Sequence, residues 1–190
     1  MARWEPGARE RLVLAAVDLF TELGYDATTV AQIAERAGVT KSTFFRHFPD
    51  KRELLAAGQE ALSQLLTEGI AEAPANATPL EAVAAGLERA STAMGPMNRE
   101  LAPRLQAAIA ANSELQARDA LKSVGLAEAM SNALRARAVP EATAHLAAEL
   151  GVLAFKQGYA QWLQAQPDAA LASYALAALE DLRAATQSLT

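Results

Sequence analysis

The sequence contains no cysteine, which excludes disulfide bonds, thiolate metal sites and thiol-based redox sensing. His47 and His145 are the only histidines and lie far apart, so a histidine-based metal site is not expected. No window approaches the roughly 18 unbroken apolar residues of a membrane-spanning helix. The apolar stretch at residues 12–20 is interrupted by Asp18 and has no signal-peptidase site after it. We therefore expect a cytoplasmic protein without membrane association, metal or cofactor.

Aromatic residues are few, at 5% of the 190 residues, and long alternating β-branched runs are missing. Alanine and leucine are abundant instead, and both favour helices. The sequence therefore predicts an all-α fold of about nine helices. Their predicted ranges are 8–23, 30–37, 41–47, 51–72, 79–93, 97–111, 114–138, 141–164 and 168–188.

Residues 28–55 contain the most informative local signals. Thr29 and Gln32 have capping-box spacing, in which each side chain bonds the other's backbone N–H, so a helix is predicted to begin after Thr29. Gly38 follows, and glycine tolerates the left-handed conformation that often ends a helix. A short helix followed by a tight turn is therefore predicted.

A second short helix is predicted from the cap at Thr40 to about His47. Phe44 and Phe48 are placed to pack inward, which leaves the polar side chains facing outward. Two short helices joined in this way form a helix-turn-helix, here at about residues 29–48, whose second helix can enter the major groove of DNA.

Charge supports this interpretation. Residues 28–52 carry five Lys or Arg against two acids, a local net charge of 5 − 2 = +3, whereas the whole chain carries −5. A positive segment on an acidic protein suits one defined phosphate-binding face.

Many positions from residue 9 to residue 56 also agree in spacing with one known family. They are Arg11–Ala16, Leu19, Phe20, Gly24, Tyr25, Thr28–Val30, Ile33, Ala34, Ala37–Val39, Thr43–Phe48, Lys51, Leu54 and Leu55. In these residues the chain resembles the N-terminal domain of tetracycline-repressor-type (TetR family) transcription regulators. The resemblance implies a DNA-binding domain at residues 1–50, a ligand-binding and dimerisation domain at residues 51–190, and a repressor rather than an enzyme.

One position departs from the family pattern. The family usually has tyrosine where this chain has Phe45, and the hydroxyl of that tyrosine commonly reaches a phosphate. Phe45 is therefore expected to keep only an apolar contact with a sugar or a thymine methyl group.

Predicted DNA contacts fall into two groups. Phosphate contacts are assigned to Thr29, His47 and Lys51, because free N–H groups at helix N-termini favour phosphate near Thr29 and Lys51. Base-edge contacts are assigned to Lys41, Ser42, Thr43 and Arg46, with Thr40 and Phe45 beside them. For Arg46 a phosphate contact is equally open.

The family resemblance also implies a pocket for a small-molecule effector in the C-terminal domain. An apolar lining with one cation would suit an acyl or aromatic acid, and a looser resemblance to acyl-coenzyme-A-responsive members points the same way. The candidate lining residues are Met94, Met97, Leu101, Arg104, Leu105, Ile109, Leu121, Met130, Phe155 and Tyr159. Ordinary core packing is the competing interpretation for each of them.

The last two predicted helices are apolar on two sides, so each needs two partners. On residues 141–164, Leu146, Leu150 and Leu153 fall together on one face. The interpretation we favour is a homodimer in which these helices pair with their symmetry mates, and a buried monomer core is the alternative. The candidate interface residues are Gly151, Gly158, Trp162, Leu171, Tyr174 and Leu182.

Two other functions remain open at this stage. Phe45 is the single feature that favours a small-molecule-binding helical adaptor that no longer reads DNA. A helical enzyme would need a catalytic constellation, and we find no nucleophile with a base, no phosphate-binding glycine loop and no paired carboxylates.

Overall fold

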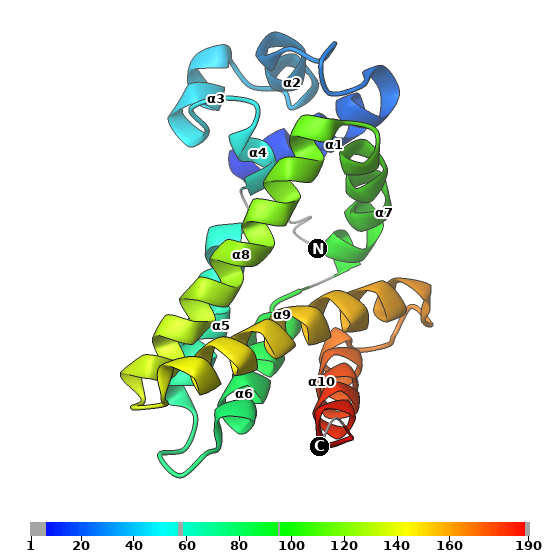
Figure 1. Cartoon of the computed structure of the whole chain (residues 1–190). Helices are drawn as coiled ribbons and strands as arrows, with labels where there is room; N and C mark the ends of the chain where they lie inside the picture. Colours follow the sequence, from blue (N-terminus) through cyan, green and yellow to red (C-terminus); the bar gives the residue numbers. More distant parts are fainter. Residues whose placement is uncertain (1–6, 57–58, 95, 189–190) are drawn as a thin grey trace, which may run out of the picture. The chain divides into compact units, whose positions relative to one another are not determined.

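The computed structural model describes residues 7–56, 59–94 and 96–188, and every regular element in these residues is an α-helix. This confirms the predicted all-α fold. The helices are α1 (Ala8–Leu23), α2 (Val30–Arg36), α3 (Lys41–His47), α4 (Glu53–Ala56), α5 (Gln59–Glu72), α6 (Pro79–Thr92), α7 (Pro96–Ala110), α8 (Ser113–Ala136), α9 (Glu141–Gln164) and α10 (Leu171–Gln187) (Figure 1).

The chain forms two compact units. We call residues 1–59 with 97–120 the head, and residues 60–96 with 121–190 the body. The head thus contains most of α7 and the first turns of α8 besides α1 to α4. The sequence predicts a boundary at residue 50 between a DNA-binding domain and a ligand-binding domain. This functional boundary stays a prediction.

The two helices of the helix-turn-helix, α2 and α3, begin where the local sequence signals predict. The N–H of Thr29 donates to Gln32 Oε1 at 2.8 Å, and the N–H of Gln32 donates to Thr29 Oγ1 at 3.3 Å, which completes the capping box of α2. Gly38 follows α2 with φ +66°, a conformation that glycine adopts readily. Thr40 then caps α3 by accepting from the N–H of Thr43 at 3.1 Å.

The core of the head joins side chains from all its main helices. Leu12 and Phe20 from α1 pack with Ile33 from α2 and Phe44 from α3, and each is at most 3% exposed. Leu115, near the start of α8, belongs to the same cluster. Burial of these side chains orients α2 and α3 firmly against α1, because each buried aromatic or aliphatic side chain contributes about 1.5–3 kcal/mol.

Within the head, α7 and the turn that follows it also make polar contacts with residues of the N-terminal segment. A guanidinium N–H of Arg104 donates to Asp18 of α1 at 2.6 Å, and the side-chain amide of Asn112 donates to Asp26 at 3.2 Å. Arg104 is predicted from the sequence to be a lone cation at the effector pocket. Its partner Asp18 lies 86 residues away in the sequence, so local sequence patterns do not indicate this ion pair.

The body is built around α6, α9 and α10, which pack against one another. Helices α5 and α6 approach closely at Gly69 and Gly86, where a Cβ on Gly69 would lie 2.7 Å from the Ala85 carbonyl oxygen. Helices α9 and α10 approach closely at Gly158, where a Cβ would lie 2.5 Å from Ala175 Cα. Glycine is therefore required at these crossings for steric reasons.

Two predicted helices differ from the structure by more than two residues in their limits. The helix expected at residues 51–72 is described as α4 and α5, on either side of residues 57 and 58, which lie outside the described part. The last helix begins at Leu171 instead of residue 168, because residues 165–170 form a turn in which Ala169 accepts a 2.7 Å hydrogen bond from the Trp162 indole. Within the described ranges, none of the helices combines the length and apolar character needed to span a bilayer.

Candidate nucleic-acid interface

Helix α3 separates an apolar face from a polar one. Phe44 is 0% exposed, and Phe48, the residue after the helix, is 2% exposed. Thr43 is half-buried. The exposed side chains of α3 are Lys41, Ser42, Phe45, Arg46 and His47. A short helix that turns cations and hydrogen-bond donors to solvent has the chemistry needed to contact base edges and phosphates in a major groove.

Phe45 is the exception on this polar face. It is 55% exposed, and its ring packs edge-to-face on Phe44 with the centroids 5.4 Å apart and the planes at 80°. The fully buried Phe44 therefore supports one side of the Phe45 ring. The exposed part of the ring is an apolar surface among polar neighbours, suited to a thymine methyl or a sugar.

The three threonines predicted to contact DNA are engaged in helix capping. The hydroxyl oxygens of Thr40 and Thr43 lie 3.0 Å apart. The hydroxyl of Thr29 donates to Gln32 Oε1 at 2.8 Å. These contacts account for the threonines structurally, so their contacts with DNA stay predictions.

The positive charge of residues 28–52 is more localised than the sequence count indicates. Arg36 donates two hydrogen bonds to Glu22, at 3.0 and 2.8 Å, and this interaction lowers the pKa of the Glu22 carboxyl. Arg52 donates to Asp50 at 2.8 and 2.6 Å and lowers the pKa of Asp50 in the same way. Glu22 lies outside the counted segment, so the sequence count missed its charge.

The cations that remain available lie on α3. Lys41 and Arg46 are exposed and have no ion pair with any described residue. Lys51, predicted to contact phosphate, directs its ammonium instead toward backbone carbonyls of the head. The strongest cationic surface of the described helix-turn-helix is therefore α3 itself.

The predicted dimer residues occupy two kinds of position in the body. Four of them are buried in the chain's own core: Gly151, Gly158, Trp162 and Leu171. Tyr174 and Leu182 are half-buried on α10. Helical periodicity cannot distinguish a close crossing within one chain from a crossing between two chains, so the role of these six residues in a dimer stays a prediction.

The predicted effector residues are distributed over both units. Arg104, Leu105 and Ile109 lie in the head, whereas Met94, Leu121, Met130, Phe155 and Tyr159 lie in the body. The side chains of Met97 and Leu101 lie outside the described residues.

Their surroundings in the body also differ. Leu121 is 69% exposed and Met130 is 1% exposed. The rings of Phe155 and Tyr159 stack with centroids 5.9 Å apart, and burial raises the pKa of the Tyr159 phenol. The effector role of all these residues stays a prediction.

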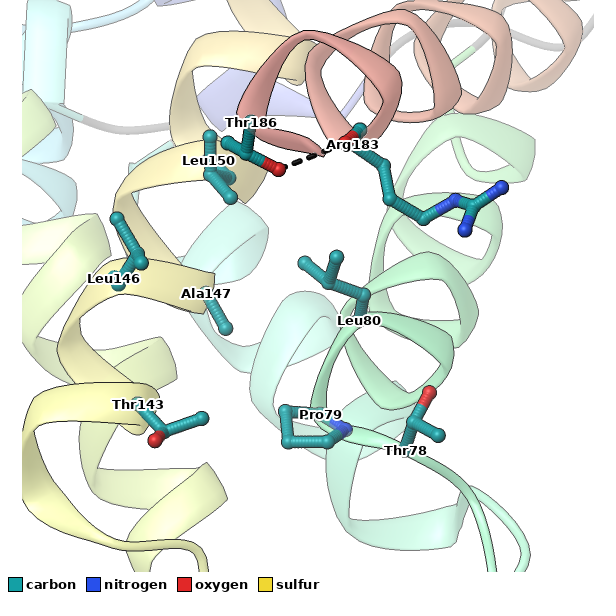
Figure 2. Close-up of a pocket in the computed structure, with 9 residues that line it drawn as sticks. All are labelled: Thr78, Pro79, Leu80, Thr143, Leu146, Ala147, Leu150, Arg183 and Thr186. Carbon is teal, nitrogen blue, oxygen red and sulfur yellow. Dashed lines mark hydrogen bonds between the residues drawn. The ribbon is translucent and has the colours of Figure 1, made fainter. Parts of the chain in front are cut away.

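Sequence reasoning missed a groove on the body with a volume of about 310 Å³. Figure 2 shows it between the start of α6, one face of α9 and the end of α10. Its lining residues are Thr78, Pro79, Leu80, Thr143, Leu146, Ala147, Leu150, Arg183 and Thr186. None of these was among the predicted site residues, although the shared face of Leu146 and Leu150 was visible in the sequence.

The segment that contains the helix-turn-helix is similar to known regulatory proteins. Residues 12–57 match the family model for bacterial regulatory proteins, tetR family. The chain is 39% identical over 75 residues to the HTH-type transcriptional regulator TcmR of Streptomyces glaucescens, covering 40% of this chain and 33% of that protein. It is 37% identical over 65 residues to the HTH-type transcriptional activator FasR of Mycolicibacterium smegmatis, covering 34% and 30%. The matched part thus spans about a third of these relatives.

Solved structures resemble the chain over nearly its whole length. The transcriptional regulator FadR from Bacillus subtilis, in complex with stearoyl-CoA, has a TM-score of 0.58 at 22% identity, covering 90% of this chain and 95% of that one. A transcriptional regulator of the TerR/AcrR family from Aquifex aeolicus has a TM-score of 0.55 at 20% identity, covering 93% and 98%. At these identities the likeness shows the fold.

The match over residues 12–57 identifies the helix-turn-helix segment as one found in DNA-binding regulators of transcription. This segment belongs to the tetR family of bacterial regulatory proteins, which confirms the resemblance seen in the sequence.

Proposed function

We propose that two copies of the chain bind a pseudo-palindromic operator and repress transcription, and that a small-molecule effector in the body releases them. Each copy places α3 in a major groove. The observation that carries this proposal is the exposed face of α3, where Lys41 and Arg46 stand free of ion pairs with the described residues beside Ser42 and His47. Cations and donors of this kind supply phosphate contacts and base readout.

The apolar face of α9 supports the homodimer. Leu146 is 58% exposed, Leu153 is 43% exposed, and Leu150 is half-buried between them. Residues spaced in this way form one stripe along a helix. An exposed apolar stripe rimmed by polar side chains is typical of a protein–protein interface. In this proposal the stripe pairs with its symmetry mate, while Gly158 and Trp162 hold α9 and α10 together within each copy.

For the effector we propose an apolar small molecule of the acyl or aromatic acid class. The stacked rings of Phe155 and Tyr159 offer apolar surface in the body. FadR from Bacillus subtilis, whose fold this chain shares, was solved with stearoyl-CoA. The effector must prefer one of two states of the protein to change operator affinity, since equal affinity for both shifts nothing.

The experiment that tests DNA binding is selection of duplexes from a random library with the purified full chain at low salt. Enrichment of a sequence with two related half-sites about 10 base pairs apart, or a multiple of that spacing, is expected for a dimer of this type. Recovery of random sequence only would contradict the proposal.

Effector binding is tested separately, by thermal-shift measurements with acyl-coenzyme-A thioesters and aromatic acids. A ligand that binds the folded state raises the melting temperature, and a flat response across both classes would remove this part of the proposal. The adaptor alternative, which rests on Phe45, predicts a thermal shift together with failure of the DNA selection.

A further inference from the structure

The side chain of Lys51 ends at a cluster of backbone carbonyls in the head. Its Nζ donates to the carbonyl oxygens of Tyr25 at 2.7 Å and Thr28 at 3.0 Å, and the Asp26 carbonyl oxygen lies 3.5 Å away. The same nitrogen lies 4.3 Å from the centroid of the Tyr25 ring. An ammonium has three donors, so this environment satisfies all of them and adds a cation–π contact.

These carbonyls belong to the connection between α1 and α2. Gly24 ends α1 with φ +85°, and α2 begins after Thr29, so residues 24–28 have no helical hydrogen-bond ladder of their own. On its inner side the connection is held by the buried hydroxyl of Thr28, which lies 2.8 Å from the Gly24 carbonyl oxygen and 3.2 Å from that of Leu19. Lys51 holds the other side, from a position about 25 residues further along the chain.

Lys51 is also rigidly placed by its neighbours in sequence. The Asp50 carboxylate accepts hydrogen bonds from the N–H groups of Arg52 at 2.7 Å and Glu53 at 3.1 Å, which caps α4. These hydrogen bonds hold the backbone of the connection between α3 and α4 on both sides of Lys51. The lysine therefore links the segment after α3 to the segment before α2, and these two segments enclose the DNA-reading pair of helices.

We infer that Lys51 is a positioning residue, which fixes the start of α2 through backbone carbonyls, and that it is not a phosphate contact. To reach a phosphate the ammonium would have to leave two short hydrogen bonds and the face of an aromatic ring. Lys41, by contrast, is exposed on α3 and has no ion-pair partner among the described residues. The DNA part of this inference rests on the proposed function, whereas the link to the carbonyls does not.

The test compares Lys51→Met with Lys41→Met in the full chain. Methionine keeps an unbranched apolar stem and removes the ammonium in both variants. The first measurement, hydrogen exchange, needs no DNA. Lys51→Met is expected to speed amide exchange in residues 24–31 about tenfold or more, since hydrogen bonds from a charged donor are lost. Lys41→Met should leave exchange in those residues unchanged.

The second measurement is the salt dependence of binding to the duplex selected by the wild-type chain. Loss of one phosphate-bound cation flattens the plot of log K against log salt concentration by about one unit. Lys41→Met removes an exposed cation that faces the duplex in the proposed complex, so it is expected to flatten the plot as well as to change the preferred sequence. Lys51→Met is expected to weaken binding about tenfold with the wild-type slope, because a displaced α2 changes geometry and not the number of neutralised phosphates.

Lys51→Gln covers the case in which Lys51→Met does not fold, because its amide can still donate to carbonyls while its charge is absent. It should bind with the wild-type slope, whereas a phosphate contact predicts a slope flattened by about one unit. A flattened slope in either Lys51 variant would overturn the inference, and so would unchanged exchange in residues 24–31 or unchanged affinity in Lys51→Met. If the wild-type chain selects no duplex, the proposed function fails, and the exchange measurement still decides whether Lys51 holds the connection.

Discussion

Replacing Gly158 by alanine tests how the body is assembled. The new Cβ would lie 2.5 Å from both the Cα and the N of Ala175 on α10. Ordinary contacts begin near 3.4 Å, so α9 and α10 would have to separate by about 0.9 Å. Overpacking of this kind costs about 1–3 kcal/mol, and backbone atoms on a packed helix cannot turn aside. Alanine recovers about 1 kcal/mol of helix propensity, so we expect a net loss of up to about 2 kcal/mol.

Gly151→Ala is the matched control, because it lies on the same helix and gains the same helix propensity. There the new Cβ meets the ends of side chains, Met130 Cε at 2.6 Å and Val83 Cγ1 at 2.7 Å. The flexible tip of Met130 can move aside, whereas Val83 is β-branched and fully buried and has less freedom to move. The cost of Gly151→Ala should still be smaller than that of Gly158→Ala, where the new Cβ meets backbone atoms.

Urea and thermal denaturation of the two variants provide the measurement. For a chain of this size each kcal/mol lowers the melting temperature by about 2–4 °C. Gly158→Ala should therefore melt several degrees below Gly151→Ala. If Gly158→Ala is as stable as Gly151→Ala, the close crossing of α9 and α10 within one chain is wrong, and the glycine is free to serve an interface between chains.

Three further predictions address the body. Arg137 donates to the carbonyls of residues 71, 73 and 74, at and just after the end of α5. Arg137→Met should therefore lose about 1–3 kcal/mol in urea denaturation, while the exposed neighbour variant Arg135→Met should lose little. The pKa of Glu81 is lowered because the backbone N–H and the hydroxyl of the residue that caps α6 donate to its carboxylate. This stabilisation is present above the unfolded-state pKa and lost as pH falls through the folded-state pKa. The stability difference between wild type and Glu81→Ala should therefore shrink between about pH 5 and pH 3, and a constant difference would contradict the assignment. Leu153→Glu should shift sedimentation from dimer to monomer, whereas His145→Glu, at the edge of the exposed face of α9, should leave the dimer intact.

The helices of the head could be predicted because their signals are local. The capping box of Thr29, the left-handed Gly38 and the cap at Thr40 each act within a few residues, and the structure places all three as expected. The inward packing of Phe44 and Phe48 follows from the same short-range periodicity. Family recognition rests on this segment as well, since the family model covers residues 12–57.

What the sequence could not supply depends on contacts between distant segments. Arg36 and Arg104 looked like available cations, and their partners Glu22 and Asp18 lie 14 and 86 residues away. The carbonyls that bind Lys51 carry no signal in the amino-acid types at all. In each case the sequence gives the charge of the side chain. The group that binds this charge depends on the tertiary fold.

Operator binding by two copies is tested most directly by footprinting and titration of the full chain with its selected duplex. We expect two chains per duplex, protection of major grooves about 34–36 Å apart on one side of the DNA, and loss of selectivity when Lys41 or Arg46 is replaced by alanine. A single chain bound without sequence preference, or protection unaffected by both replacements, would contradict this proposal.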